Sequence, residues 1–212
     1  MKAIVLGSSG LVGGHLLNQL INDSSFTQIT IFVRKLLPIH NSKLIQIVFD
    51  FNTYSTTLNL DGDVVFCCLG TTIKKAGSKE AFRKVDFDAP LFFAKEAKKS
   101  NVKCFCLVSS MGASANSSIF YSKVKGELED EIAKLSFPSS GMFRPSLLLG
   151  ERSESRMGEN LGKYLMLAFD FLIPAKYKAI EASKVAMSMI DFAKKAQTGH
   201  YVFLSNQIQK FQ

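Results

Sequence analysis

The sequence lacks the features that mark secreted and membrane-spanning proteins. Its longest apolar run, residues 165–174, is too short to cross a bilayer and contains Asp170. A glycine-rich turn begins at residue 7, before the apolar segment of a secretory signal peptide could form. We therefore expect a soluble protein with no membrane span, located in the cytoplasm.

Cysteine is scarce, with four residues in a chain of 212. Cys67 and Cys68 are adjacent in a strand-like run, so their side chains point to opposite faces and cannot bind one metal ion together. The spacing of Cys104 and Cys106 is not a usual zinc spacing. Reduced thiols within the core, and no metal site, are predicted.

The chain also lacks a block of positive charge, although its formal net charge is +8. Adjacent lysines occur only as three separate pairs, at positions 74–75, 98–99 and 194–195. A nucleic-acid-binding function would rest on this charge alone. A generally basic surface, with no specific nucleic-acid partner, is the favoured interpretation.

What the chain does contain is a regular alternation of short apolar runs and longer helical segments. This alternation predicts an α/β fold with a Rossmann-like, doubly wound parallel sheet and helices on both faces. Residues 1–212 are expected to form a single domain, in which residues from about 150 to 195 contribute a small substrate-side region. The predicted strands are residues 2–6, 29–33, 44–49, 64–68, 103–108, 141–144 and 201–204. The predicted helices are residues 78–99 with a kink at Pro90, 121–135, 159–171 and 182–196.

A turn with glycines at positions 7, 10 and 13 follows the first strand and leads into a helix. In a dinucleotide site, Gly7 would allow the tight turn, Gly10 would let backbone approach a pyrophosphate, and Gly13 would allow close packing of the helix. The helix N-terminus would face the phosphates with free N–H groups. The alternative is an ordinary strand-to-helix turn. The other residues assigned to cofactor binding in this turn are Ser8, Ser9, Leu11 and Val12.

The residues that follow the other strands should lie at the same edge of the sheet, where ligands bind in this fold. Arg34 and Lys35 stand where NAD-binding proteins usually have an acidic residue, which favours NADP(H) over NAD(H); the alternative is a solvated basic pair. Asp50 and Phe51 are expected to contact the adenine. The remaining residues assigned to the cofactor are Leu69, Gly70, Thr71, Ser109 and Pro145.

Tyr121 and Lys125 form a Y-x-x-x-K pair that shares one face of a predicted helix. A nearby ammonium favours ionisation of a phenol, which would allow Tyr121 to exchange a proton with a substrate oxygen. Lys125 would also bond the nicotinamide ribose, and Tyr121 would lie against the cofactor. Ser110, with Ser109 as the second choice, would orient the substrate carbonyl. The alternative is a packed tyrosine and a solvated lysine at an ordinary helix start.

Taken together, these motifs resemble those of an atypical short-chain dehydrogenase/reductase, of the Tat-interacting-protein type of NADPH-binding oxidoreductase-like proteins. The resemblance implies a Rossmann-like domain that binds NADP(H) at the glycine turn, and a catalytic set of Ser110, Tyr121 and Lys125. Many extended members of the family carry an asparagine near position 86, where this chain has Asp86, so a proton relay through that asparagine is not expected. The matching stretches are residues 7–13, 67–72, 107–110, 121–127, 143–145 and 152–156.

Two functions remain open at this point. The first is an NADP(H)-dependent oxidoreductase that acts on a small carbonyl or alcohol. The second is an NADPH-binding regulator, which would bind a protein partner without significant turnover. The substrate pocket, or a helix packed on the sheet, would involve Met157, Leu161, Tyr164, Leu165, Phe169 and Phe171.

Overall fold

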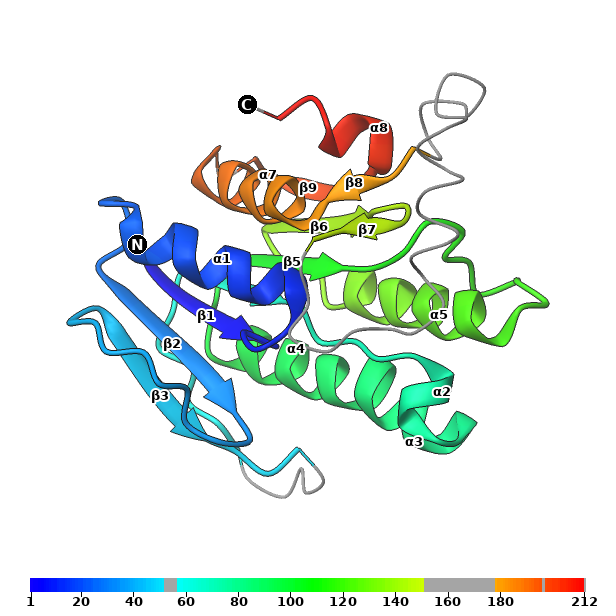
Figure 1. Cartoon of the computed structure of the whole chain (residues 1–212), viewed down its shortest axis with the longest axis horizontal. Helices are drawn as coiled ribbons and strands as arrows, with labels where there is room; N and C mark the ends of the chain where they lie inside the picture. The colour runs from blue at the N-terminus through cyan, green and yellow to red at the C-terminus, as the bar shows by residue number, and fades with distance from the viewer. Residues whose placement is uncertain (52–56, 151–177, 196, 212) are drawn as a thin grey trace.

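The structure is a computed structural model that describes residues 1–51, 57–150, 178–195 and 197–211. Its centre is a sheet of seven parallel strands, in the order β3-β2-β1-β4-β5-β6-β9, with helices on both faces (Figure 1). The strands are β1 (Lys2–Leu6), β2 (Gln28–Val33), β3 (Leu44–Val48), β4 (Val64–Cys67), β5 (Cys104–Val108), β6 (Ser139–Arg144) and β9 (Gly199–Leu204). The predicted Rossmann-like fold is confirmed.

The order in which the chain adds strands to the sheet reverses between β1 and β4, although all the strands are parallel. From β1 the chain adds β2 and β3 on one side, and then crosses back to add β4, β5, β6 and β9 on the other. In register, Leu6 lies opposite Phe32 of β2 and Cys67 of β4. The segments that follow these strands therefore leave the sheet at one level. In open parallel sheets, ligands bind where the strand order reverses, so the segments after β1 and β4 are the first place to look for a site.

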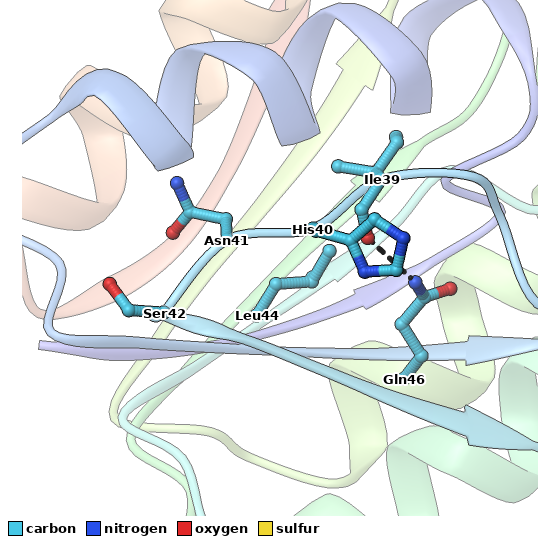
Figure 2. Close-up of a pocket in the computed structure, with 6 residues that line it drawn as sticks. All are labelled: Ile39, His40, Asn41, Ser42, Leu44 and Gln46. Carbon is cyan, nitrogen blue, oxygen red and sulfur yellow. Dashed lines mark hydrogen bonds between the residues drawn. The ribbon is translucent and has the colours of Figure 1, made fainter.

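The connection between β2 and β3 lines a shallow pocket of about 550 Å³, open to solvent, beside the start of β3. The amide of Gln46 donates to the carbonyl of Ile39 (Figure 2) and also bonds the backbone N–H and carbonyl of Leu37, and so holds the connection against the strand. The lining consists of Ile39, His40, Asn41, Ser42, Leu44 and Gln46. Because this pocket lies beside the start of a strand, it is separate from the strand ends that carry the candidate site residues.

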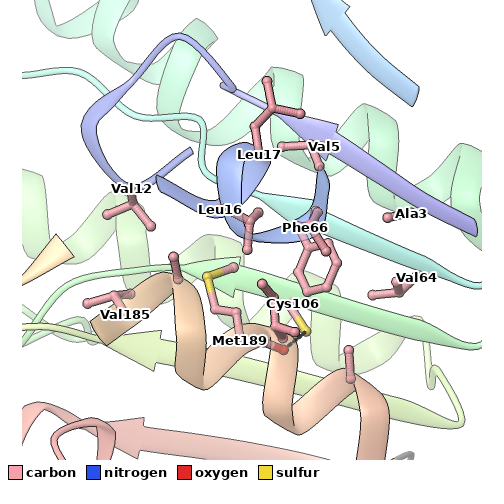
Figure 3. Close-up of a cluster of buried hydrophobic side chains, with 14 of the residues drawn as sticks. Ala3, Val5, Val12, Leu16, Leu17, Val64, Phe66, Cys106, Val185 and Met189 are labelled. Atoms are coloured by element: carbon pink, nitrogen blue, oxygen red, sulfur yellow. Dashed lines mark hydrogen bonds between the residues drawn. The ribbon is translucent and has the colours of Figure 1, made fainter. Parts of the chain in front are cut away.

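Successive residues of the central strand pack on opposite faces of the sheet. Ala3 and Val5 of β1 join the core formed with α1 (Leu11–Asn22) and α7 (Ala182–Lys195), part of which is shown in Figure 3. Ile4 and Leu6 join the opposite core, which includes side chains of α4 (Ala89–Lys99) and α5 (Phe120–Lys134). This burial on both faces explains why the parallel strands are nearly continuous apolar runs.

The predicted helix at 78–99 is present, but its irregularity comes before Pro90. The run begins as α3 (Lys79–Arg83), widens into the π-helical turn η1 (Lys84–Asp88), and continues as α4. Proline has no N–H, and its ring clashes with the carbonyl four residues earlier in an α-helix, which here belongs to Asp86. The wider turn lies at the position where Pro90 would otherwise meet that carbonyl.

Several short elements carry no periodic pattern and were not predicted. They are α2 (Ile73–Ala76), the two-residue strands β7 (Leu148–Leu149) and β8 (Ile180–Glu181), which pair with each other, and α8 (Ser205–Ile208). The predicted helix at 159–171 lies outside the described residues. So do the six residues between Met157 and Phe171 that are expected to line a pocket or pack on the sheet. Within the described ranges, every helix is too short or too polar to traverse a membrane.

The cysteines lie in or directly after two central strands. Cys67, Cys104 and Cys106 are buried and Cys68 is half-buried, and all four are free thiols. Burial is the main cause that raises the pKa of Cys67, to about 12, and a nearby Asp86 contributes in the same direction. This thiol is therefore protonated at physiological pH and serves as a core side chain.

Candidate functional site

The glycine turn has the backbone geometry that its spacing predicts. Gly7 has φ of +78°, and a Cβ there would lie 2.6 Å from the carbonyl oxygen of Cys68. A Cβ on Gly13 would lie 2.1 Å from the carbonyl oxygen of Gly7. Neither position accepts a side chain without movement of the backbone. The two glycines therefore let the first turn of α1 lie directly against the end of β1 and the segment after β4.

The start of α1 has free hydrogen-bonding groups. Gly10 occupies the N-cap position and supplies no side-chain bond to the first helical N–H groups. Ser9 and Gly10 are exposed, whereas the Ser8 hydroxyl oxygen is buried and has no partner among the described residues. Leu11 is half-buried, and Val12 packs in the core with α7. A phosphate placed here would meet free N–H donors and the positive end of the helix dipole.

The candidate residues after β2 and β3 lie at the same edge of the sheet but differ in exposure. Arg34 and Lys35 are exposed directly after β2, and Asp50 is exposed after β3. The half-buried ring of Phe51 packs on Phe49 and Phe93, with ring centroids 5.1 and 5.9 Å apart. Phe51 is thus partly a core residue, which its position after a strand did not reveal.

The turn after β4 meets a buried carboxylate. Leu69 and Thr71 are half-buried and Gly70 is exposed. The backbone N–H of Thr71 donates to Oδ2 of Asp86 over 2.8 Å. A Cβ on Gly70 would lie 3.4 Å from Oδ1 of Asp86 and 3.6 Å from Nζ of Lys125. The predicted cofactor turn and the predicted catalytic lysine are therefore neighbours, with Asp86 between them.

Helix α5 carries Tyr121 on its first turn and Lys125 on its second. Tyr121 is half-buried, and its ring packs on Phe82 with centroids 5.4 Å apart. Lys125 is buried, and its ammonium lies within electrostatic range of Tyr121. The alternative of a solvated lysine is therefore wrong. Both side chains lie at the edge of the sheet that carries the glycine turn.

The serine segment after β5 is fastened to α5. A Cβ on Gly126 would lie 2.2 Å from the backbone of Ser114 and Ala115, so only glycine lets the segment approach this closely. The N–H of Ser114 also donates to the carbonyl of Ser122. Gly126 stands directly after Lys125 in the sequence, yet its packing role was not predicted, because helix glycines give no local signal of what they contact.

Ser109 and Ser110 both present unpaired hydroxyls. Their Oγ atoms are buried and have no hydrogen-bond partner among the described residues. The backbone N–H of Ser109 donates to the carbonyl of Phe143, and the carbonyl of the buried Pro145 accepts the N–H of Met111. The segments after β5 and β6 are thereby joined at the site. Because unpaired buried hydroxyls are costly, a bound ligand is the natural partner for these two groups.

Lys125 is not the lone ammonium that the Y-x-x-x-K pattern predicts. Its Nζ lies 2.8 Å from Oδ1 of Asp86, and the exposed fractions of the two side chains are 4% and 0%. Burial lowers the pKa of Lys125, but the charges of Asp86 and Tyr121 more than offset it, so the net shift is upward. Lys125 is therefore a cation at neutral pH, and its charge is balanced by a buried carboxylate.

The described residues fit a dinucleotide at this edge. Ser9 and Gly10 are exposed at the start of α1, which has no side-chain cap and could receive a pyrophosphate, and the unpaired serine hydroxyls and the buried lysine lie at the other segments that meet there. Among the residues that the structure describes, no group of three His, Cys, Asp or Glu side chains is placed to bind a metal ion.

Comparison with known proteins gives two kinds of relative. The chain is 36% identical over 210 residues to "Protein FMP52, mitochondrial" of Candida albicans, covering 94% of this chain and 90% of that one. It is 39% identical over 168 residues to "Protein HTATIP2" of Rattus norvegicus, covering 76% of this chain and 69% of that one. No family model matches the sequence.

Solved structures share the fold. MoeE5 in complex with UDP-glucose and NAD superimposes with a TM-score of 0.73 at 16% identity, covering 96% of this chain and 75% of that one. The Bordetella bronchiseptica enzyme WbmH in complex with NAD+ gives 0.72 at 16% identity, covering 99% of this chain and 78% of that one. At these identities the likeness concerns the fold alone.

The comparison corrects the cytoplasmic location that we expected. Fungal relatives from Candida albicans, Meyerozyma guilliermondii and Scheffersomyces stipitis are all named as mitochondrial proteins. The lack of a secretory signal separates secreted from intracellular proteins. It does not distinguish the cytoplasm from an organelle.

Proposed function

Because the chain belongs to the family of atypical short-chain dehydrogenases/reductases that includes FMP52 and HTATIP2, we propose that it is an NADP(H)-dependent oxidoreductase acting on a small carbonyl or alcohol. The observation that carries this proposal is the buried Lys125 on the same helix as Tyr121, next to the turn after β4. Burying an ammonium is costly, and a lysine with a purely structural role could reach solvent instead.

The cofactor would lie along the strand ends between β1 and β4. The turn from Gly7 to Gly13 and the start of α1 would hold the pyrophosphate. Arg34 and Lys35 would bond a 2′-phosphate, Asp50 and Phe51 would meet the adenine, and Lys125 would bond the nicotinamide ribose. Contact with the rest of the cofactor would come from Leu69, Gly70, Thr71, Ser109, Tyr121 and Pro145. The complexes of MoeE5 and WbmH, which contain NAD and NAD+, support a nicotinamide cofactor for this fold.

The bound nicotinamide would supply or accept a hydride, and side chains of this protein would donate or accept the accompanying proton. The hydroxyl of Ser110 would donate a hydrogen bond to the substrate oxygen and fix its position. Tyr121 would give a proton to that oxygen in reduction, or take one in oxidation. Its packing on Phe82 would restrict the phenol to a narrow range of directions. Residues from about 150 to 195 are proposed to complete the substrate side.

The test follows NADPH consumption optically with a panel of small aldehydes and ketones. We expect turnover by the parent protein, and a loss of about 10²- to 10⁴-fold in kcat/KM in Tyr121→Phe, because a positioned acid contributes about this much. Calorimetry should show that the variant still binds NADPH with an affinity close to that of the parent.

Two results would separate the alternatives. If parent and variant bind NADPH equally and neither turns over any carbonyl, the oxidoreductase proposal fails, and an NADPH-binding regulator takes its place. If NADH binds more tightly than NADPH, the role given to Arg34 and Lys35 is wrong.

A further inference from the structure

Asp86 is a buried charged residue on an irregular turn. Its side chain is fully buried, and it lies in the middle of the π-helical turn η1. Single π-helical turns within α-helices often occur at functional sites, because they direct a side chain away from the regular helix face. Here the turn directs a carboxylate toward the candidate active site.

The two oxygens of this carboxylate contact different elements. Oδ1 lies 2.8 Å from Nζ of Lys125 on α5, and Oδ2 accepts the N–H of Thr71 in the turn after β4. Asp86 therefore links η1, α5 and the turn that is proposed to contact the cofactor. A buried ion pair gains little stability over apolar packing, because both charges lose their hydration. Stability alone is thus a weak reason to keep this pair.

We propose that Asp86 is a positioning residue that fixes Lys125 beside the turn after β4 and balances its charge, so that Tyr121 faces a neutral ion pair. This inference rests on the proposed oxidoreductase function. A neutral pair stabilises a phenolate less than a lone ammonium does. Tyr121 is then suited to donate a proton, and the site is suited to reduce a carbonyl.

The groups that act on Lys125 come from three elements. Asp86 faces it from η1, Tyr121 from its own helix, and Cys67 from β4. Burial raises the pKa of Cys67 to about 12, so this thiol carries no charge at neutral pH. Asp86 is the member of this set that supplies a full opposite charge to the ammonium.

The decisive variant is Asp86→Asn, which keeps the shape of the side chain and removes its charge. We expect kcat for carbonyl reduction at neutral pH to fall about 10- to 100-fold, since an unbalanced ammonium favours the phenolate, which cannot donate a proton, and a misplaced Lys125 adds to the loss. KM should change less, and activity should recover as the pH is lowered. Glu96→Gln is the matched control, because Glu96 is a buried carboxylate that also bonds a lysine and a backbone N–H. Glu96→Gln should leave the pH profile of kcat unchanged.

A second readout needs no turnover. The ultraviolet absorbance of phenolate, taken as the difference between each protein and its Tyr121→Phe counterpart, should begin to rise at lower pH in Asp86→Asn than in the parent. Circular dichroism checks that the proteins remain folded over this range. If Asp86→Asn shifts neither this absorbance nor the pH profile, or if Glu96→Gln shifts them equally, the proposal is wrong.

A double variant covers the case in which Asp86→Asn does not fold. Asp86→Asn with Lys125→Met removes both charges, so the absorbance rise should begin near the pH found for the parent. A clear move to higher pH would show that Lys125 acts as an unbalanced cation, which would overturn the proposal. If the parent shows no turnover, the proposed function fails, while the absorbance measurements still decide the role of Asp86.

Discussion

Asp86 and Glu96 lie on one helical run, and each buried carboxylate accepts a backbone N–H and pairs with a lysine. Asp86 bonds Thr71 and Lys125, whereas Glu96 bonds the N–H of Leu58 over 2.9 Å and Nζ of Lys99 over 2.6 Å. The lysines differ: the side chain of Lys125 is 4% exposed, and that of Lys99 is 65% exposed.

The two pairs also lie at opposite ends of β4. Glu96 holds the segment that leads into the strand, where Ser100 also accepts the N–H of Leu60. Asp86 holds the turn that leaves the strand. A carboxylate whose lysine remains in water fastens a loop at little electrostatic cost. A carboxylate whose lysine is also buried places two charges in a low dielectric, which points to a role beyond fastening.

Replacement of each lysine by methionine should give the largest difference in stability between the Asp86–Lys125 pair and the Glu96–Lys99 pair. Lys125→Met leaves Asp86 buried without its counter-charge, so we expect the free energy of unfolding to fall by about 3–5 kcal/mol. Lys99→Met removes a largely solvated partner and should cost less than about 1 kcal/mol. Urea denaturation measures both values, and equal losses would contradict the distinction between the pairs.

Replacement of Glu96 should show that its main task is to satisfy a backbone group. Glu96→Ala leaves the N–H of Leu58 without its acceptor, and we expect a loss of about 1–3 kcal/mol in the free energy of unfolding. Glu96→Gln retains an oxygen that can accept this N–H and should recover at least half of the loss. If the amide variant is as unstable as the alanine variant, charge and not hydrogen bonding dominates at this position.

The free energy of unfolding should depend on pH in opposite directions for Glu96 and Lys125. These effects should be smaller than those of the substitutions above. Burial raises the pKa of Glu96, but the bonds from Lys99 and Leu58 outweigh it, so the net pKa lies below the ordinary 4.5. Its contribution is therefore present above pH 4.5 and is lost as the pH falls through the native pKa.

Lys125 behaves in the opposite sense. Its pKa is raised above 10.5, so its contribution is complete below that pH and is lost as the pH rises through the native pKa. Melting temperatures recorded across the acid and alkaline ranges should therefore show that Glu96→Gln flattens the acid decline and Lys125→Met flattens the alkaline one. The reverse assignment would contradict the linkage.

The sequence predicted the features that depend on neighbouring residues. The spacing of the glycines from Gly7 to Gly13, between a strand and a helix, is a local pattern, and Gly13 avoids a clash with the nearby carbonyl of Gly7. The clash that Gly7 avoids is with Cys68, in a distant part of the chain, and has no local signal. The parallel sheet follows from the alternation of apolar runs and helices. The pairing of Lys125 with Asp86 could not be predicted, since it joins distant parts of the chain through a turn whose shape depends on Pro90. Similarly, neither the clash that Gly126 avoids nor the packing of Phe51 has a local signal in the sequence.

The direction in which the side chain of Asp86 points is set by the π-helical turn at Lys84–Asp88, and not by the residue type at that position. Each residue of an α-helix turns the next by about 100° around the axis, so removing one residue from this stretch would rotate Asp86 away from Lys125 without altering its chemistry. Insertion and deletion, as well as substitution, can therefore change the charge presented to the tyrosine. Among relatives of this chain, the length of the segment before Pro90 would then matter as much as the identity of the residue at position 86.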